Sequence, residues 1–322
     1  MPDQAISKVI ESWTVPVEHA NIRLDAFARA CLPQLSRREV DRAIREGLFS
    51  LNGRPSKKGE RLGAGDTLVF TGPETWMAVS PPPNPHLRVP VVYEDSSILI
   101  VDKPAGMPTH GFSGQDTGTL ANYIACKHAE ILAVGKNLWE PGIVHRLDIE
   151  TSGIVLIAKT PTAFARLRQQ FRRKYVRKMY WALVWGLTDA EGRIEAPLAH
   201  DWSDRRRMRA IRETEKSKNQ RIWPATTEYR RIGHSRGLSL LEVNMKTGVT
   251  HQIRVHLAAI GHPIVSDALY GAADSDTLDL QRHFLHAYRL TFRHPEDGRS
   301  VTVDTKLPDE LREVLRHVGI RL

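Results

Sequence analysis

Two segments near the N-terminus have the spacing of amphipathic helices. In residues 21–33, Leu24, Phe27 and Ala28 recur at helical intervals, and residues 35–47 repeat the pattern. The second segment opens with Ser36 and Glu39 at capping-box spacing and closes at a glycine, a common helix stop. An Asn-Gly turn and a β-rich stretch follow, up to residue 70. The pattern predicts a small α+β unit.

Beyond residue 90 the chain mixes short β-rich runs with helical patterns. The strand candidates are residues 97–104, 153–160, 178–186 and 238–245. Helices are expected at 160–174 and at 250–261. The residues expected to face the core are Phe164, Leu167 and Phe171 in the first of these helices and Ile253, Leu257 and Ile260 in the second. Because strands and helices do not alternate strictly, we expect a mixed α+β fold with a largely antiparallel central sheet and flanking helices.

A proline-rich stretch, residues 80–90, separates these two parts. Four of the five residues from Pro81 to Pro85 are proline, which disfavours both helix and sheet pairing. We therefore expect a loose lead-in at 1–18, a small domain at 19–79, a semi-rigid linker at 80–90 and a large domain at 91–322.

The charge balance points to a polyanionic partner. The chain of 322 residues has a formal net charge of +9 and a pI near 9.7. Such a surplus of Lys and Arg is typical of proteins that bind nucleic acid, although an ordinary basic enzyme is the alternative. Only two cysteines occur, and we see neither a secretory signal nor an apolar run of the ~20 residues that span a bilayer. We expect a cytoplasmic protein without membrane association, acting as a monomer.

The basic residues gather in clusters. Arg38, Arg42 and Arg45 share one side of the second predicted helix. Residues 166–178 contain seven Lys or Arg and no acid, including Arg172, Arg173 and Lys174, and residues 205–221 form a further patch. Such runs are usually solvated faces. Together, without a large apolar face beside them, they favour contacts with a phosphate backbone over a membrane.

Common cofactor motifs are absent from the sequence. His145, Asp148, His251 and His256 could be considered for a metal site, but there is no HExxH, and the last two lie five residues apart. No P-loop, strand-linked GxGxxG or nucleophile-elbow GxSxG occurs. We therefore expect chemistry without a metal or a small-molecule cofactor.

The loop "HRLDIETSGIVLIAKT", residues 145–160, is the most informative stretch. On residue types alone, its aspartate could equally be a structural turn residue. The loop resembles the central motif of RluA-type pseudouridine synthases, and four other segments agree in order: "YEDSSILIVDKPAGMPTHG", "KMYWALVWG", "TGVTHQIRVHLAAIGHPIVSDALYG" and "LHAYRLTFRHP". Residues 23–54, followed by "GERLGAGDTLVF", resemble an S4-type RNA-binding domain.

This resemblance implies a cofactor-free RNA uridine isomerase with the pseudouridine synthase fold. Asp148 matches the catalytic aspartate, acting as nucleophile or base, and Arg254 the arginine that pairs with it. Tyr180 matches the tyrosine that stacks on uracil, and Arg146 the arginine that holds the flipped nucleotide. Large-subunit ribosomal RNA is the favoured partner. Transfer RNA modification, a non-catalytic RNA-binding or ribosome-assembly role and, more remotely, a metal-dependent hydrolase are the alternatives.

Two positions depart from the family pattern. Val249 stands where arginine is usual, and Ser266 replaces a usual glycine. The segment 197–229 also drifts from the common pattern. Since the aspartate, tyrosine and arginine are all present, we expect these departures to affect the choice of RNA target rather than activity.

Overall fold

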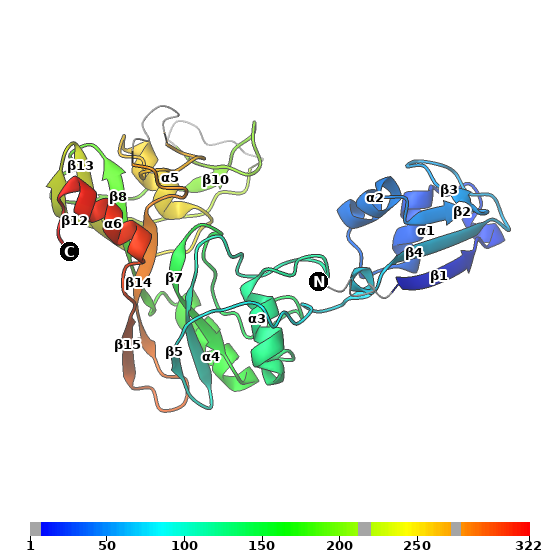
Figure 1. Cartoon of the computed structure of the whole chain (residues 1–322), viewed down its shortest axis with the longest axis horizontal. Helices are drawn as coiled ribbons and strands as arrows, with labels where there is room; N and C mark the ends of the chain where they lie inside the picture. Colours follow the sequence, from blue (N-terminus) through cyan, green and yellow to red (C-terminus); the bar gives the residue numbers. More distant parts are fainter. Residues whose placement is uncertain (1–7, 212–219, 272–277) are drawn as a thin grey trace.

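The computed structural model describes residues 8–211, 220–271 and 278–322. Figure 1 shows a small lobe built from the N-terminal residues and a larger lobe that contains the rest of the chain. Their apolar side chains form separate cores, one from Val15 to Trp76 and one from Val89 to Ile320. None of the helices in the described ranges is long and apolar enough to cross a bilayer.

The small lobe packs two helices on a four-stranded sheet with the order β1-β4-β2-β3. Its elements are β1 (Lys8–Thr14), η1 (Val17–His19), α1 (Leu24–Cys31), α2 (Arg37–Arg45), β2 (Phe49–Leu51), β3 (Arg54–Pro55), β4 (Thr67–Pro73) and η2 (Glu74–Met77). The capping box predicted at α2 is present: Ser36 accepts from the backbone N–H of Glu39, whose carboxylate accepts in return from that of Ser36. The expected α+β unit is therefore observed.

The expectation of a loose lead-in is wrong for residues 8–18. Strand β1 pairs with β4 over its full length, from Lys8 opposite Pro73 to Thr14 opposite Thr67. The sequence gives little sign of this strand because backbone pairing holds it at the edge of the sheet while its side chains stay largely in solvent, with Ile10 69% exposed. Residues 1–7 lie outside the described part of the chain.

The large lobe is organised by a nine-stranded sheet within the described residues. Its order is β5-β6-β7-β14-β8-β13-β12-β9, and β15 pairs with β14. The strands are β5 (Val91–Glu94), β6 (Ile98–Lys103), β7 (Ser152–Ala158), β8 (Arg177–Trp185), β9 (Glu191–Ile194), β12 (Thr227–Ser235), β13 (Leu238–Met245), β14 (Leu285–Arg293) and β15 (Ser300–Asp304). Among the strands that the structure describes, only β7 and β14 pair in parallel, so the prediction of a largely antiparallel sheet is confirmed.

Helices flank this sheet, as expected for the mixed α+β class. They are α3 (Leu120–Lys127), η3 (Ala129–Ile131), α4 (Pro161–Arg172), α5 (Gln252–Ala259) and α6 (Asp309–Val318). Thr160 caps α4 through the backbone N–H of Ala163, and a proline occupies the first turn as predicted. The inward orientation expected for Ile260 is wrong: α5 ends one residue earlier, and this side chain is 38% exposed. A separate two-stranded hairpin consists of β10 (Leu198–His200) and β11 (Met208–Ala210).

Residues 80–90 form neither helix nor strand. They are nevertheless attached to the large lobe, since the side-chain amide of Asn122 donates to the carbonyl of Pro82 and that of Asn84 donates to the carbonyl of Thr117. Just before this stretch in the sequence, the hydroxyl of Thr75 in η2 also contacts the large lobe, where it accepts from the side-chain amide of Gln115. The proline-rich stretch is thus held by side chains of the large lobe, and its role as a domain boundary remains a prediction.

Candidate active site

The loop that enters β7, residues 143–151, begins at a glycine that no other residue could replace without strain. Gly142 has φ +63, and a Cβ there would lie 2.3 Å from the carbonyl oxygen of Ala158. This close approach lets the loop turn against its own strand, where Ile143 bridges to Ile157. The loop therefore leaves the sheet at the buried β7 and carries His145, Arg146 and Asp148 with it.

Side chains from distant parts of the sequence hold the loop by its carbonyl groups. Arg168 donates to Val144 O, Thr109 to Leu147 O at 3.0 Å and Lys103 to Ile149 O at 3.1 Å. Arg282 donates to Glu150 O at 3.0 Å, and the hydroxyl of Thr151 lies 2.8 Å from Nε2 of His283. The backbone around Asp148 is fixed before any substrate arrives.

His145 has a structural role in this loop. Its Nε2 accepts the backbone N–H of Leu156 at 3.0 Å, and its ring stacks on Phe171 of α4 at 4.9 Å. Burial, with a smaller contribution from the nearby Lys178 and Arg168, lowers the pKa of His145 to about 3. The imidazole is therefore neutral and fastens the loop to β7 and α4.

Asp148, Arg254 and Asp267 form a chain of ion pairs. Nη1 of Arg254 lies 3.2 Å from Oδ2 of Asp148. The same guanidinium donates to both carboxylate oxygens of Asp267, through Nε at 2.7 Å and Nη2 at 2.8 Å. Asp148 remains 22% exposed at its side chain, whereas that of Asp267 is fully buried. A fixed, largely buried cation is thus presented to an accessible carboxylate.

Tyr180 lies on β8, paired with Val243 of β13 and Ala287 of β14, so its ring is placed by the centre of the sheet. Its side chain is buried and lines the same cavities as Asp148. Burial, and secondarily the charge of Asp148, raises the pKa of the Tyr180 phenol well above its ordinary value. The phenol is therefore neutral at physiological pH.

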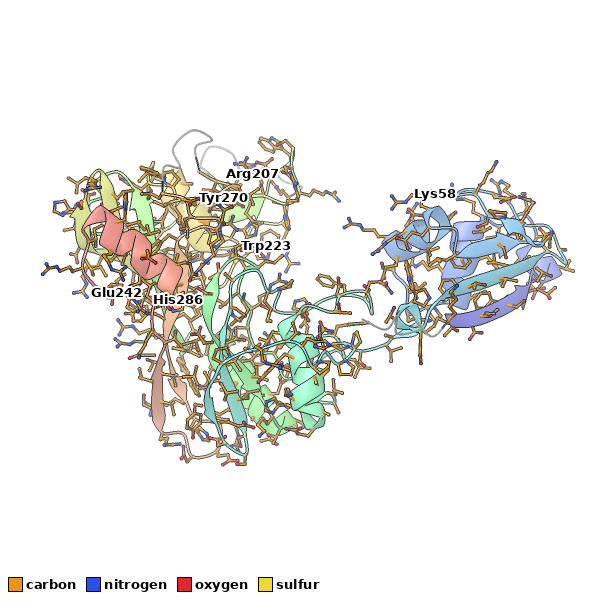
Figure 2. The ribbon with its side chains drawn as sticks, viewed as in Figure 1. Lys58, Arg207, Trp223, Glu242, Tyr270 and His286 are labelled. Atoms are coloured by element: carbon orange, nitrogen blue, oxygen red, sulfur yellow. The ribbon has the colours of Figure 1, made fainter. Side chains whose placement is uncertain are left out.

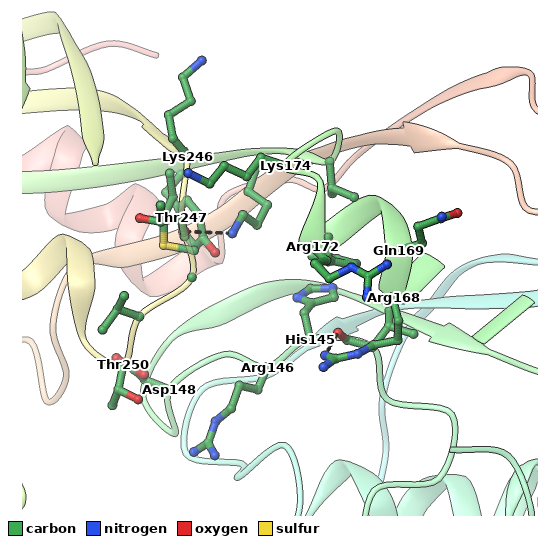
Figure 3. A pocket seen from close by; sticks show the side chains of 18 of the residues that line it. His145, Arg146, Asp148, Arg168, Gln169, Arg172, Lys174, Lys246, Thr247 and Thr250 are labelled. Atoms are coloured by element: carbon green, nitrogen blue, oxygen red, sulfur yellow. Dashed lines mark hydrogen bonds between the residues drawn. The ribbon is translucent and has the colours of Figure 1, made fainter. Parts of the chain in front are cut away.

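A cavity of about 720 Å³ opens beside Asp148, between the loop, α4 and the segment that follows β13. Its wall is strongly basic; the cations are Lys136, Arg146, Arg168, Arg172, Lys174, Lys178 and Lys246. Figure 3 shows Lys246 in the upper part of the view, Arg172 and Arg168 to the right, and Asp148 and Arg146 at the bottom. A small inner pocket of about 50 Å³ continues past Asp148 to His251 and Arg254. The combination suits a polyanionic chain that delivers one small group to a carboxylate.

The structure brings some of the predicted RNA-binding residues together and separates others. Arg146, Arg172 and Lys174 line the cavity with Asp148, and Arg146 also lies 3.3 Å from Nε2 of His110. Arg173 lies on the opposite side of α4, in a groove against residues 293–298. The arginines of α2 belong to the small lobe and are exposed; one of them, Arg42, pairs with Glu46 and lies over the ring of Trp76.

The histidines considered as metal ligands have other partners. His256 is buried between the hydroxyl of Thr227 and the carbonyl of Ala196, each at 2.9 Å. His251 lies 2.8 Å from the hydroxyl of Tyr270. Across residues 8–211, 220–271 and 278–322 there is no group of three or more His, Cys, Asp or Glu arranged to hold a metal ion.

Comparison with known proteins decides what this site belongs to. Residues 97–259 match the model of the RNA pseudouridylate synthase family, and residues 22–68 match that of the S4 domain. The chain is 34% identical over 313 residues to "Ribosomal large subunit pseudouridine synthase D" of Neisseria meningitidis serogroup B, covering 94% of this chain and 80% of the relative. The chain belongs to the RNA pseudouridylate synthase family. The predicted family and S4 domain are thereby confirmed.

Other relatives agree with this membership. An "Uncharacterized RNA pseudouridine synthase" of Chloroflexus aurantiacus is 39% identical, covering 95% of this chain and 93% of the relative. The solved structure "Human RNA Pseudouridylate Synthase Domain Containing 1" is similar with a TM-score of 0.56 and 26% identity, over 70% of this chain and 86% of that one. The fold and the enzyme class inferred from the sequence are confirmed.

The two departures from the family pattern have visible structural consequences. Ser266 has φ +56, in the left-handed region that favours glycine, and its buried hydroxyl finds no partner among the described residues. Val249 lines both the cavity and the inner pocket, so the wall is apolar where the family usually has a cation. The drifting segment after residue 197 forms the β10–β11 hairpin, with residues 212–219 outside the described part.

Several residues of the site were not identified from the sequence. Asp267 and Tyr270, which contact Arg254, occur within the segment "PIVSDALYG" that carries the resemblance, yet neither was assigned a role. Lys103, Arg282 and His283 support the loop from β6 and the segment before β14. For Asp267 the sequence offered one signal, since it is a carboxylate shortly after the helix that carries Arg254. A buried guanidinium needs more than one anionic contact, so a second acid beside Arg254 could have been expected.

Proposed function

We propose that this pseudouridine synthase isomerises uridine in large-subunit ribosomal RNA, with Asp148 as its essential residue. The observation that carries the proposal is the Asp148–Arg254 ion pair at 3.2 Å, at the inner end of a cavity lined by cations. A binding protein would have no use for an accessible carboxylate inside a basic cavity, since it repels the phosphates that the cations attract. Placed beside a single flipped nucleotide, the same carboxylate is a reactant.

In the proposed reaction the N1–C1′ glycosidic bond of the uridine breaks, the uracil turns, and C5 bonds to C1′. The proton on C5 then leaves and N1, released from the ribose, takes up a proton, so the product has the composition of the substrate. Asp148 acts on the ribose side of the bond, as nucleophile or as base. Arg254 orients this carboxylate through the 3.2 Å contact, and the pocket of about 50 Å³ beyond it admits only a small group.

Tyr180 is proposed to stack on the uracil and to take part in removal of the C5 proton. Its ring is buried in the sheet beside Asp148, which gives the base a rigid surface. Because burial and Asp148 raise the pKa of the phenol, no standing phenolate is available. Proton removal must therefore pass through the neutral hydroxyl and a second acceptor in the complex.

Arg146 is proposed to hold the nucleotide out of its stack. It lies two residues before Asp148, is exposed, and borders both the large cavity and the inner pocket. Unstacking a base costs a few kcal/mol, which an inserted guanidinium recovers by filling the vacated position. Arg172 and Lys174 are proposed to contact the phosphates on the α4 side of the cavity.

The choice of ribosomal RNA rests on relatives named for the large ribosomal subunit, such as those of Neisseria meningitidis and Nitrosomonas europaea. The reaction would then take place in the cytoplasm. Action on transfer RNA is the second candidate, since the site geometry suits either RNA. Cofactor independence and a monomeric state remain predictions of the proposal.

The test is tritium release from RNA labelled at uridine C5, with unmodified large-subunit ribosomal RNA and transfer RNA as parallel substrates. The wild type should release tritium from the ribosomal RNA, and Asp148→Asn should release none while binding the RNA within a few-fold. Turnover by Asp148→Asn would overturn the role of this residue. Preferential release from transfer RNA would overturn the substrate, and release that survives a chelator would support cofactor independence.

A further inference from the structure

The β10–β11 hairpin is built as a fixed element beside the active site. Leu198 and Met208 pack with Val255 of α5 in a small core of their own, joined by Trp223 and Tyr270. The backbone N–H of Met208 donates to the hydroxyl of Tyr270 at 2.8 Å. The hairpin is therefore anchored on the same helix that carries Arg254.

Arginines lie over aromatic rings on this hairpin and on the segment that follows it. The guanidinium carbon of Arg209 lies 3.9 Å from the ring centre of Trp202, and that of Arg221 lies 5.1 Å from the ring centre of Trp223. His200 meets Trp223 edge to face at 5.4 Å. We call the rings of His200, Trp202 and Trp223 the aromatic platform. Figure 2 shows Trp223, Tyr270 and Arg207 at the same end of the large lobe.

Trp202 is the exposed tryptophan of the aromatic platform, whereas Trp223 is half-buried. Its side chain is 74% exposed although Arg209 covers one face of the indole, so the other face is open to solvent. The open indole face is a flat apolar surface of the kind on which a nucleic-acid base can stack. The turn itself is ordered by Asp201, whose carboxylate accepts the backbone N–H of Ser203 at 2.8 Å.

A set of contacts joins the turn of the hairpin to Asp148. The guanidinium carbons of Arg207 and Arg254 lie 5.3 and 5.1 Å from the ring centre of Tyr270. Arg254 in turn contacts Asp148. An RNA strand with one nucleotide at Asp148 would therefore have its neighbouring nucleotides within reach of the hairpin.

We propose that Trp202 stacks on an unpaired base of the RNA, next to the nucleotide that enters the active site. The inference rests on the proposed function and adds to it a second recognition point that selects single-stranded or loop RNA. Stacking on an aromatic ring tolerates any base, and the arginine behind the ring strengthens the contact. The exposed Arg205 and Arg207 supply charge for the adjoining phosphates.

The charge on the hairpin favours RNA over a protein partner. Asp201 and Asp204 are both engaged within the turn, the second by Arg206 through contacts of 2.8 to 3.2 Å. The remaining exposed charges are cationic. A protein interface would instead be expected to surround an anchoring tryptophan with apolar contacts and few like charges.

The experiment measures RNA binding by the full chain carrying Asp148→Asn, so that chemistry does not enter. The probes are a single-stranded 12-nucleotide RNA and the same strand in a blunt duplex. Trp202→Ala should weaken binding to the single strand about tenfold and to the duplex less than twofold, whereas Trp202→Phe should stay within threefold of the parent. Leu187→Ala, which truncates another exposed apolar side chain (61%), is the matched control and should change neither.

Equal binding of the single strand by Trp202→Ala and the parent would overturn the proposal, as would an equal loss on both probes. Quenching of tryptophan fluorescence on addition of the single strand is the second measurement. It should be smaller in Trp202→Phe than in the parent, and unchanged quenching would contradict a stacked base. Neither measurement requires turnover. Both can therefore be interpreted even if the protein does not isomerise uridine.

Discussion

Asp267, whose side chain is fully buried, holds the guanidinium of Arg254 through two hydrogen bonds of 2.7 and 2.8 Å. The carboxylate is itself fixed by the backbone N–H groups of Leu269 and Tyr270 at 3.0 and 3.1 Å. A bidentate contact of this kind leaves a single orientation for the remaining Nη1, which points at Asp148. The orientation of the cation beside Asp148 is thus determined by a carboxylate that is out of reach of the RNA.

Asp267→Asn should lower the rate of isomerisation about 100-fold while leaving RNA affinity within a few-fold, because Arg254 is then free to turn away from Asp148. Breaking a buried ion pair should also reduce the free energy of unfolding by about 3 kcal/mol. Tritium release and thermal unfolding measure the two effects. Asp304→Asn, which removes the exposed ion pair with Arg289, is the control and should change stability by less than about 1 kcal/mol.

The same pair predicts a pH dependence. Burial alone raises the pKa of Asp267, but its hydrogen bonds with Arg254 and the charge of that arginine outweigh burial, and the pKa lies below its ordinary value of 3.8. A lowered pKa in the folded state means that the stabilisation is complete above the ordinary value and is lost as the pH falls through the folded pKa. Below pH 3.8 the unfolding temperature should fall more steeply in the wild type than in Asp267→Asn. If the unfolding temperatures of the wild type and Asp267→Asn fall equally steeply at low pH, the prediction is contradicted.

Val249→Arg should restore a phosphate contact in the wall of the cavity. Each added contact makes the slope of log affinity against log salt concentration more negative by about 0.7 to 0.9. The measurement is RNA binding at several salt concentrations in the Asp148→Asn background. Val249→Gln, which adds length without charge, should leave the slope unchanged; an equal change in both variants would show that shape rather than charge is responsible.

Ser266→Gly should raise the free energy of unfolding by about 1 kcal/mol, because glycine adopts the left-handed conformation without strain. Ser266 has two unfavourable features, a strained backbone conformation and a buried hydroxyl without a partner among the described residues. Ser266→Ala separates them, since it keeps the strain and removes only the hydroxyl. Denaturant unfolding of the three proteins gives the comparison. A less stable glycine variant would mean that the serine hydroxyl has a stabilising partner.

The exposed arginines of α2 should contribute charge to RNA binding from the small lobe. Replacing Arg38, Arg42 and Arg45 by Gln should make the salt slope about 2 units shallower, with Arg42 contributing least because Glu46 already pairs with it. Gln substitutions at Arg312, Arg316 and Arg321, which remove the same charge near the C-terminus, provide the control. If both triple variants bind equally, the small lobe does not contact RNA.

Local patterns predicted those elements whose signals lie within one turn or one strand. The capping box of α2, the Thr160–Pro161 start of α4 and the buried run of β7 were all recognisable. Strand β1 was missed because its partner, β4, lies more than fifty residues away and its side chains remain in solvent. Ile260 was placed inward because a helical pattern does not specify where the helix ends.

The sequence predicted only those site residues that match a motif of the family. Asp148, Tyr180 and Arg254 are far apart in the sequence, and only family resemblance suggested that they meet. Asp267 could not be found by periodicity, since its contact with Arg254 spans thirteen positions that include the end of α5 and the loop after it. The aromatic platform combines residues from β10, from the turn after it and from the segment beyond β11, and no local pattern links Trp202 to Arg209.

The fastening of the Asp148 loop has a consequence for how the enzyme gains and loses activity. Its carbonyl groups are bound by residues 24, 38, 46 and 132 positions away in the chain. Contacts of such range close only after most of the large lobe has folded. A partly folded or locally opened molecule would therefore be inactive before it lost much secondary structure, and the amide protons of Leu147 and Thr151 should exchange with solvent only in the most cooperative opening of the domain.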